Sequence, residues 1–181
     1  LQIVANDGVL VQSDSYRFVE FIDLSTHDEI KVIDAKAFKG CSRLTEIVLP
    51  RELEIIEEQA FAECLNLKSI VFPATLKKIG DYAFANCVKL DSMSFSARSM
   101  DTIGQYAFAN CEALEYLRLP SEKIDRIGHH AFIDCVGLKQ VDLPSKIIST
   151  TPFIFARCNQ LYEFSIHRER GMRLESGCVF M

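Results

Sequence analysis

Residues Ala60–Pro73 read AFAECLNLKSIVFP, and variants of this phrase fill most of the 181-residue chain. Further copies begin at Ala37, Ala83, Ala107 and Ala131, and a degenerate copy, IFARCNQLYEFSIH, begins at Ile154. Self-similarity at a fixed period of about 20 to 50 residues is the signature of stacked repeats. One unit is too short to bury its own apolar side chains, but copies stacked on one another can bury them together. The sequence therefore predicts a solenoid.

Within each unit, the spacing of apolar residues separates the elements. Ile70 and Phe72 stand two apart, which places both side chains on one face of a strand, and a proline closes the strand. The Ala-Phe-x-x-Cys segment predicts one helical turn, with phenylalanine and cysteine on the same side. Leu53 and Ile56 predict a second short extended segment on another side of the coil.

A glycine recurs in three copies, at Gly80, Gly104 and Gly128, directly after an isoleucine. Glycine is the residue that best tolerates a tight bend or a positive φ. The pattern predicts one of these two features at the same point of each coil.

Six of the seven cysteines follow the period, at intervals of 23 or 24 residues: Cys41, Cys64, Cys87, Cys111, Cys135 and Cys158. A redox or metal ladder is one interpretation, since stacked coils would bring successive Cα atoms to about 5 Å. However, side chains projecting in parallel disfavour the disulfide torsion, and no CxxC zinc spacing occurs. We therefore expect buried free thiols. Cys178 lies outside the series and is the candidate exposed thiol.

The ends of the chain depart from the repeat. Apolar runs flank Asn6-Asp7-Gly8, which predicts a hairpin, and Phe18 to Leu24 alternates like a degenerate strand. We predict an N-terminal cap over residues 1–29, a solenoid over 30–166 and a C-terminal cap or tail over 167–181.

Composition excludes several classes of protein. The net charge of −5 and the isoelectric point near 5.4 argue against nucleic-acid binding, which needs a basic face. No apolar run reaches the roughly 18 to 20 residues that span a bilayer. The chain begins at Leu1 rather than methionine, so we expect that an N-terminal segment has been trimmed, and the absence of a signal peptide is silent on export.

The pattern AFxxCxxLxxIxLPxxLxxI, over roughly residues 30–166, resembles the BspA-like (Treponema pallidum-type) leucine-rich repeats. The resemblance implies an α/β repeat solenoid, a right-handed superhelix with a parallel concave β-sheet and about six coils of 23–24 residues. It also implies a secreted or surface location and a role in adhesion or protein binding. The departures are Ser96, where the pattern has proline, and Thr151-Pro152-Phe153-Ile154, where it has glycine and Ala-Phe.

Histidine and charge clusters offer few signs of chemistry. His129 and His130 occupy variable positions before an Ala-Phe, which favours a solvated surface pair over a metal or acid–base site. The run from His167 to Arg173 is locally basic and is typical of a solvated tail. No nucleophile-elbow, HExxH, P-loop or GxGxxG motif occurs. The sequence thus predicts no enzyme, no cofactor and no metal.

Function is expected on the outward side of the predicted strands, between the buried positions. The candidate contact residues there are Glu46, Val48, Ser69, Val71, Ser92, Ser94, Tyr116, Arg118, Gln140, Asp142, Glu163 and Ser165. Tyrosine and arginine are enriched at binding hot spots, so the expected contact centre is Tyr116 with Arg118. Ser94 and Gln140 flank this centre.

Two functions remain open from the sequence. The first is a non-enzymatic module that holds a protein or peptide on the concave sheet. The alternative is a structural spacer that stacks with other copies or other domains of a surface protein. A carbohydrate-binding role is less favoured, because Tyr116 is the one aromatic residue among these candidate positions.

Overall fold

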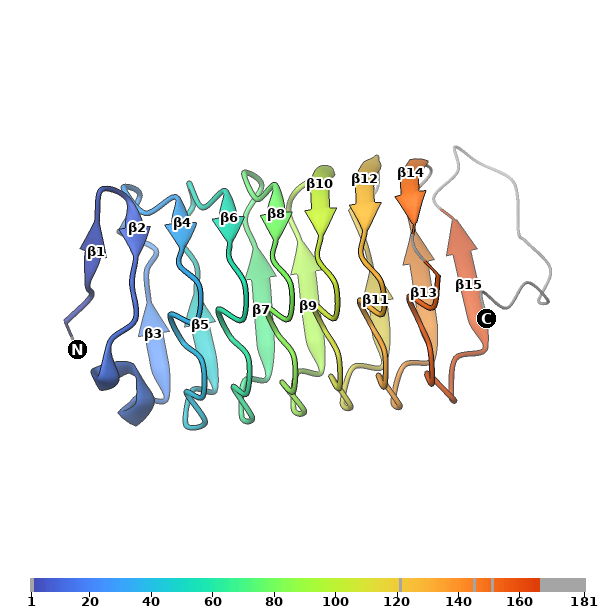
Figure 1. The fold of residues 1–181 in the computed structure, drawn as a ribbon, viewed down its shortest axis with the longest axis horizontal. Coiled ribbons are helices and arrows are strands. Elements are labelled where there is room, and N and C mark those ends of the chain that lie inside the picture. The colour runs from blue at the N-terminus through green and yellow to red at the C-terminus, as the bar shows by residue number, and fades with distance from the viewer. Residues whose placement is uncertain (1, 121, 145, 151, 167–181) are drawn as a thin grey trace.

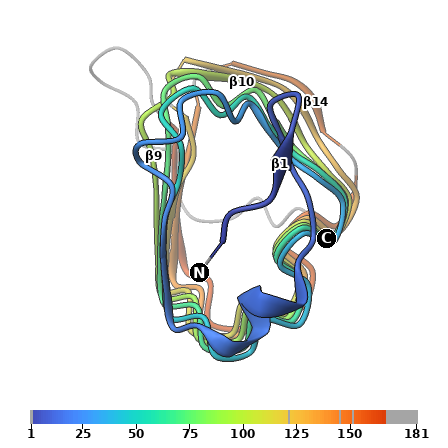
Figure 2. The same ribbon diagram turned by 90° about the vertical axis from the view of Figure 1, so that its left-hand side faces the viewer.

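The computed structural model describes residues 2–120, 122–144, 146–150 and 152–166. The chain winds into seven stacked coils (Figure 1), which superimpose when viewed along the stack (Figure 2). Apolar side chains from every coil pack together in one continuous core. The predicted leucine-rich-repeat solenoid is confirmed, and its core is built from the positions that recur in the sequence.

Strands lie along two sides of the coils. One side is an eight-stranded sheet of β1 (Ala5–Asn6), β2 (Val9–Leu10), β4 (Val32–Ile33), β6 (Ile55–Ile56), β8 (Lys78–Ile79), β10 (Ser99–Ile103), β12 (Lys123–Ile127) and β14 (Lys146–Thr150), in that order. The other side consists of β3 (Phe21–Asp23), β5 (Glu46–Val48), β7 (Ser69–Phe72) and β9 (Ser92–Phe95), followed by β11 (Tyr116–Arg118), β13 (Gln140–Leu143) and β15 (Glu163–Ile166). Apart from the β1–β2 hairpin, the strand pairs are parallel.

The first described coil differs from the others in its local structure. The predicted hairpin is present, with Asp7 and Gly8 both at positive φ in its turn. A 3₁₀ helix, η1 (Asp14–Phe18), then brings Tyr16 into the core, where its ring lies 5.0 Å from that of Phe38. The backbone N–H of Val4 donates to the Tyr16 hydroxyl at 2.9 Å. This coil therefore ends the aromatic column with a hydroxyl that has a partner, while the boundary at residue 29 stays a prediction.

The predicted helical turn at Ala-Phe-x-x-Cys is wrong. In the repeat beginning at Ala60, Ala62 N donates to Gln59 O at 3.1 Å and Cys64 N to Phe61 O at 3.2 Å, but Gln59 and Glu63 both have positive φ. Because these two residues are left-handed, the segment does not form a helix, and other backbone amides in it point toward the next coil. Phe61 N thus donates to Ala83 O of the next coil at 2.7 Å. We call the Ala-Phe-x-x-Cys segment of each coil a corner. Each corner consists of two tight turns whose backbone amides bond to the corner of the next coil. In the described part of the chain, η1 is the one helix.

The recurring glycines mark close approach of the backbones rather than positive φ. A Cβ on Gly104 would lie 2.5 Å from the backbone carbon of Gly80, and a Cβ on Gly128 would lie 2.5 Å from that of Gly104. Neither glycine is among the described residues with positive φ. The left-handed residue comes two positions later, at Tyr106 and His130. The predicted positive φ is therefore wrong for these two glycines, and the close approach of neighbouring coils was not predicted.

The six periodic cysteines are buried free thiols, as predicted. Each Sγ from the second member onward lies near the carbonyl oxygen of the phenylalanine in the preceding coil. For example, the Cys87 thiol donates to Phe61 O at 3.2 Å, and the Cys135 thiol donates to Phe108 O at 3.3 Å. Burial raises the pKa of the Cys87 thiol to about 12 and that of Cys41 to about 11. The ladder therefore ties coils together, and burial disfavours the reactive thiolate in its first five members, whereas the hydrogen bond with Cys135 lowers the pKa of Cys158.

We expect the first five ladder thiols to resist alkylation in the folded protein. With Cys158→Ser/Cys178→Ser as background, iodoacetamide at pH 8.5 should modify none of the first five ladder thiols within the time needed to modify all of them in urea, because burial blocks access and disfavours the thiolate. Mass spectrometry of the intact protein gives the count. Fast modification of Cys64 or Cys111 in the folded state would contradict this expectation. Cys178 itself, and the basic run at 167–173, lie outside the described residues.

Candidate functional site

Two columns of side chains run along the outward side of β3, β5, β7, β9, β11, β13 and β15, which we call the strand face. The ladder registers place Phe21, Glu46, Ser69 and Ser92 in the first column, which continues through Tyr116, Gln140 and Glu163. The second column contains Asp23, Val48, Val71 and Ser94, and continues through Arg118, Asp142 and Ser165. All twelve predicted residues lie here. The prediction missed Phe21 and Asp23, because the first coil was set apart as a cap.

The strand face is interrupted in the middle. β9 ends one four-stranded sheet and β11 begins a separate three-stranded sheet, and no backbone hydrogen bond among the described residues joins the two strands. The interruption follows the copy that has Ser96 in place of proline and one extra residue. Ser96 N still donates to Phe72 O of the preceding coil, and Ala97 is buried. The chain leaving β9 thus follows β7 and turns inward, away from β11.

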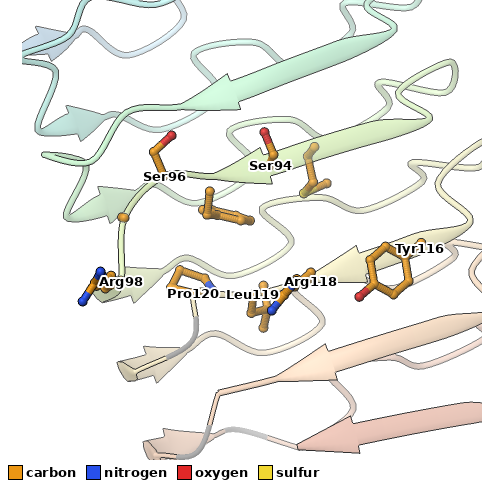
Figure 3. A pocket seen from close by; sticks show the side chains of 10 residues that line it. Ser94, Ser96, Arg98, Tyr116, Arg118, Leu119 and Pro120 are labelled. Atoms are coloured by element: carbon orange, nitrogen blue, oxygen red, sulfur yellow. The ribbon is translucent and has the colours of Figure 1, made fainter. Parts of the chain in front are cut away.

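A hollow of about 410 Å³ lies where the two sheets part. Figure 3 shows Ser94 and Ser96 on one side of it, Tyr116 and Arg118 on the other, and Arg98 at its end. Apolar lining comes from Met93, Phe95, Ala97, Leu119 and Pro120. Of the predicted residues, the structure therefore brings Ser94, Tyr116 and Arg118 together, whereas the others extend along the face. Ser96 and Arg98 were missed, although the lost proline pointed to this segment.

The side of the hollow formed by β11 is held by Asp142 of β13. The Tyr116 hydroxyl donates to Asp142 Oδ2 at 3.1 Å, and the Ser165 hydroxyl donates to Asp142 Oδ1. Partial burial and the Asp142 carboxylate raise the pKa of Tyr116 above its ordinary value. Tyr116 therefore stays neutral and in place at physiological pH, as a hydrogen-bonding aromatic residue at the edge of the hollow.

Two arginines border the hollow at ion-pair rather than hydrogen-bond distance from carboxylates. Arg118 Nε lies 3.7 Å from Asp142 Oδ2, and Arg98 Nη1 lies 3.6 Å from Glu122 Oε1. The Arg98 and Arg118 side chains are 83% and 61% exposed, so water screens both pairs. The arrangement places two exposed guanidinium groups beside three hydroxyls, from Ser94, Ser96 and Tyr116.

The remainder of the strand face changes character along the stack. Toward the N-terminal coils, Val71 is 60% exposed and Phe21 is 51% exposed, and Val48 lies half-buried between them. Toward the C-terminal coils the face is polar, with Asp142 and Glu163. Gln140 donates to Glu163 at 2.7 Å. The hollow therefore lies between a section in which Val71, Val48 and Phe21 accompany the acidic residues Asp23 and Glu46, and a polar section with Asp142 and Glu163.

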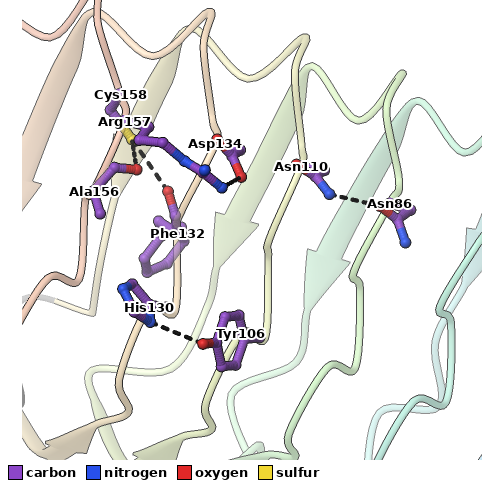
Figure 4. Close-up of polar contacts among 9 residues, drawn as sticks. All are labelled: Asn86, Tyr106, Asn110, His130, Phe132, Asp134, Ala156, Arg157 and Cys158. Atoms are coloured by element: carbon purple, nitrogen blue, oxygen red, sulfur yellow. Dashed lines mark hydrogen bonds and ion pairs between the residues drawn. The ribbon is translucent and has the colours of Figure 1, made fainter.

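A second aromatic column lies outside the core, at the left-handed residue that precedes each Ala-Phe. Tyr82 stacks on Tyr106 with centroids 4.9 Å apart, Tyr106 packs against His130 at 5.1 Å, and His130 packs against Phe153 at 5.7 Å. The His130 Nδ1 lies 3.0 Å from the Tyr106 hydroxyl (Figure 4). His129 and His130 are half-buried in this column, so the predicted solvated pair is wrong.

Because His130 is packed here, acid should weaken the outer column. Burial, His129 and Arg157 lower the pKa of His130, while Asp134 opposes them. The unfolded chain therefore binds the proton more readily, and the stability contributed by neutral His130 is lost as the pH falls through the unfolded pKa near 6.5. The loss levels off below the folded pKa. Urea unfolding of wild type and His130→Phe between pH 7.5 and 5.5 should show a steeper decline for wild type. Parallel curves would contradict the assignment.

Within the described residues, no group of three or more His, Cys, Asp or Glu side chains is arranged to hold a metal ion. The described residues also contain no helix of the length and apolarity needed to cross a membrane.

Comparisons with known proteins agree with the repeat. The model of the BspA type leucine rich repeat region matches residues 11–121 and 95–175, with six copies. The crystal structure of the T. pallidum leucine rich repeat protein is 30% identical, with a TM-score of 0.79 over 91% of this chain and 78% of that chain. A leucine-rich repeat protein from Eubacterium ventriosum has the same fold, with 19% identity and a TM-score of 0.71 over 92% of this chain and 48% of that one. No curated protein sequence matches the chain. The protein belongs to the family of BspA-type leucine-rich-repeat proteins.

Proposed function

We propose that this protein is a non-enzymatic binding module that holds a protein or peptide on its strand face, with the hollow between β9 and β11 as the contact centre. The observation that carries the proposal is the placement of Ser94, Tyr116 and Arg118 around one hollow at the single interruption of that face in the described chain. At the hollow, the backbone path and the types of exposed side chain differ from those of the other coils, whereas the core residues recur from coil to coil.

The chemistry of the hollow supports protein or peptide binding. Tyrosine and arginine supply large contact surfaces with polar ends, and they dominate the binding energy of many interfaces. The apolar section at Val71 and Phe21 gives the same face area that a partner can cover. A secreted or cell-surface location, in keeping with adhesion, is part of the proposal and is supported by membership of the family.

The test uses a random peptide library displayed on phage, selected on the wild-type protein. Selected peptides should bind the Tyr116→Ala/Arg118→Ala variant roughly 30-fold more weakly, the loss expected when a hot-spot side chain worth about 2 kcal/mol is removed. Both side chains are exposed, so the free energy of unfolding should change by less than about 1 kcal/mol.

The matched control is Tyr82→Ala/Arg126→Ala, which removes the same two side-chain types from exposed positions away from the strand face. Its affinity should equal that of wild type. Equal binding by the two double variants would reject the strand face as the binding surface.

A further inference from the structure

We propose that the hollow binds a carboxylate of the partner, from an aspartate or glutamate side chain, and that an apolar residue of the same segment lies on Val71. This inference rests on the proposed function and names the chemistry that the site recognises. Four features of the described residues support it: the cations, the hydroxyls, the loose existing ion pairs and the distribution of charge along the strand face.

The cations approach the hollow from its two halves. Arg118 projects from β11, and Arg98 comes from the segment that leaves β9 (Figure 3). A guanidinium group offers paired N–H donors that match the two oxygens of a carboxylate. The hydroxyls of Ser94 and Ser96 line the same space and can donate to an anion, whereas the Tyr116 hydroxyl already donates to Asp142. Basic and hydroxyl groups at one recess favour an acidic ligand.

The acidic neighbours leave the arginines able to bind a ligand. The ion pairs of 3.6 Å from Arg98 to Glu122 and of 3.7 Å from Arg118 to Asp142 each involve an exposed arginine, and such pairs contribute little, about 0 to 1 kcal/mol each. Asp142 is 17% exposed and already accepts two hydroxyl donors, so it stays with β13. Because a guanidinium has five N–H donors, Arg118 can keep Asp142 and bind a second carboxylate.

Charge along the two columns fixes where an acidic group can lie. Asp23 and Glu46 occupy the N-terminal coils, while Asp142 and Glu163 occupy the C-terminal coils. Arg118 is the one cation in these two columns among the described residues. A ligand carboxylate is therefore repelled from both ends of the face and attracted to its centre.

The uncharged section beside the hollow indicates what kind of residue the ligand carries next to its acid. Val71 and Ser94 separate Arg118 from the acidic N-terminal coils. β7 lies two coils from β11, at least about 9.5 Å away, because paired strands are about 4.8 Å apart and β9 and β11 are not paired. An extended peptide rises about 3.3 Å per residue, so a ligand crossing the coils places a residue on Val71 about three positions from its acid. Val71 is 60% exposed, and an apolar side chain there would remove it from water.

The experiment uses peptides selected on the wild-type protein, and fluorescence anisotropy measures their binding. We expect them to carry an aspartate or glutamate with an apolar residue about three positions away. Changing that acid to its amide should weaken binding about tenfold or more, as should Arg98→Gln/Arg118→Gln. The amide change should have little further effect in the double variant, because the two changes remove the same interaction. Arg126→Gln, which removes an exposed arginine on β12, is the matched control and should bind like wild type.

The outcomes separate this inference from the proposed function. Peptides that lack an acid, or that bind Arg98→Gln/Arg118→Gln as tightly as wild type, would overturn the carboxylate site. The binding role of the strand face would survive that result if Tyr116→Ala/Arg118→Ala still lost affinity. Tenfold tighter binding of a peptide with phosphoserine in place of the acid would reassign the hollow to phosphate esters. Failure to select any peptide that prefers wild type over Tyr116→Ala/Arg118→Ala would reject both proposals.

Discussion

Phe84→Ala should lower the free energy of unfolding by about 4 to 5 kcal/mol, the upper part of the range for removal of a buried phenylalanine. Phe84 is fully buried at the middle of the core column. Its ring stacks on Phe61 at 4.9 Å and on Phe108 at 5.1 Å, and meets Phe72 edge-on at 5.6 Å. Each aromatic pair contributes about 0.5 to 1.5 kcal/mol beyond the buried area, and the substitution removes all three.

Urea unfolding followed by circular dichroism measures this loss. The control is Phe18→Ala, the same substitution at a side chain that is 70% exposed in η1, and it should change the free energy of unfolding by less than about 1 kcal/mol. Similar losses for the two variants would show that the column does not carry the stability assigned to it. Because coils are stabilised by their neighbours, we also expect the middle position to be more costly than either end.

Gly104→Asn should destabilise the protein by at least about 3 kcal/mol, at or beyond the usual range for overpacking. Its Cβ would lie 2.5 Å from the backbone carbon of Gly80 and 2.6 Å from the backbone nitrogen of Asp81. Backbone atoms cannot rotate away as a side chain can, so the two coils would have to separate. That separation would stretch the hydrogen bond from Gly104 N to Ile79 O, now 2.8 Å.

The control for this prediction is Gly40→Asn. Gly40 has positive φ with nothing within 4 Å of an added Cβ, and later coils place Asn86 and Asn110 at the equivalent position. Asparagine tolerates this backbone, so the free energy of unfolding should stay within about 0.5 kcal/mol of wild type. Thermal unfolding of the two variants side by side decides the matter. Equal losses would mean that glycine serves at position 104 for a reason other than coil spacing.

The repeat predicted most of the fold because its recurring residues are the packing residues. Phe61, Cys64 and Leu67 are each fully buried, as their recurrence indicated. The backbone conformation of the Ala-Phe-x-x-Cys corner was not predicted correctly from the sequence. A phenylalanine and a cysteine three residues apart fit a helical turn, but left-handed residues such as Gln59 hold turns in which the amides bond to the next coil. Contact between coils overrides local helical preference here.

The sequence predicted which residues of the candidate site face solvent, but it did not predict the hollow beside them. Alternation within the strands placed Tyr116 and Arg118 on the solvent side, and the structure agrees. The interruption between β9 and β11 could not be predicted, because it depends on how the backbone accommodates one inserted residue. Two copies carry an insertion, but β11, whose copy keeps Pro120, still pairs with β13, whereas β9, whose copy has Ser96, does not pair with β11. The outer aromatic column could have been predicted, because the aligned copies of the repeat have Tyr82, Tyr106, His130 and Phe153 at one position.

The interruption between β9 and β11 also has a thermodynamic consequence. In a linear array, stability is a sum of terms for each coil and for each contact between neighbours. The contact between these two coils lacks one of its two strand ladders, so the N-terminal and C-terminal halves of the stack are joined there by the eight-stranded sheet, the turn hydrogen bonds such as Phe84 N to Ala107 O, and the core. A ligand that touches both Ser94 and Arg118 bridges the two halves. Binding of such a ligand to the folded chain alone would therefore strengthen the one contact between described coils that lacks a ladder and raise the stability of the whole stack.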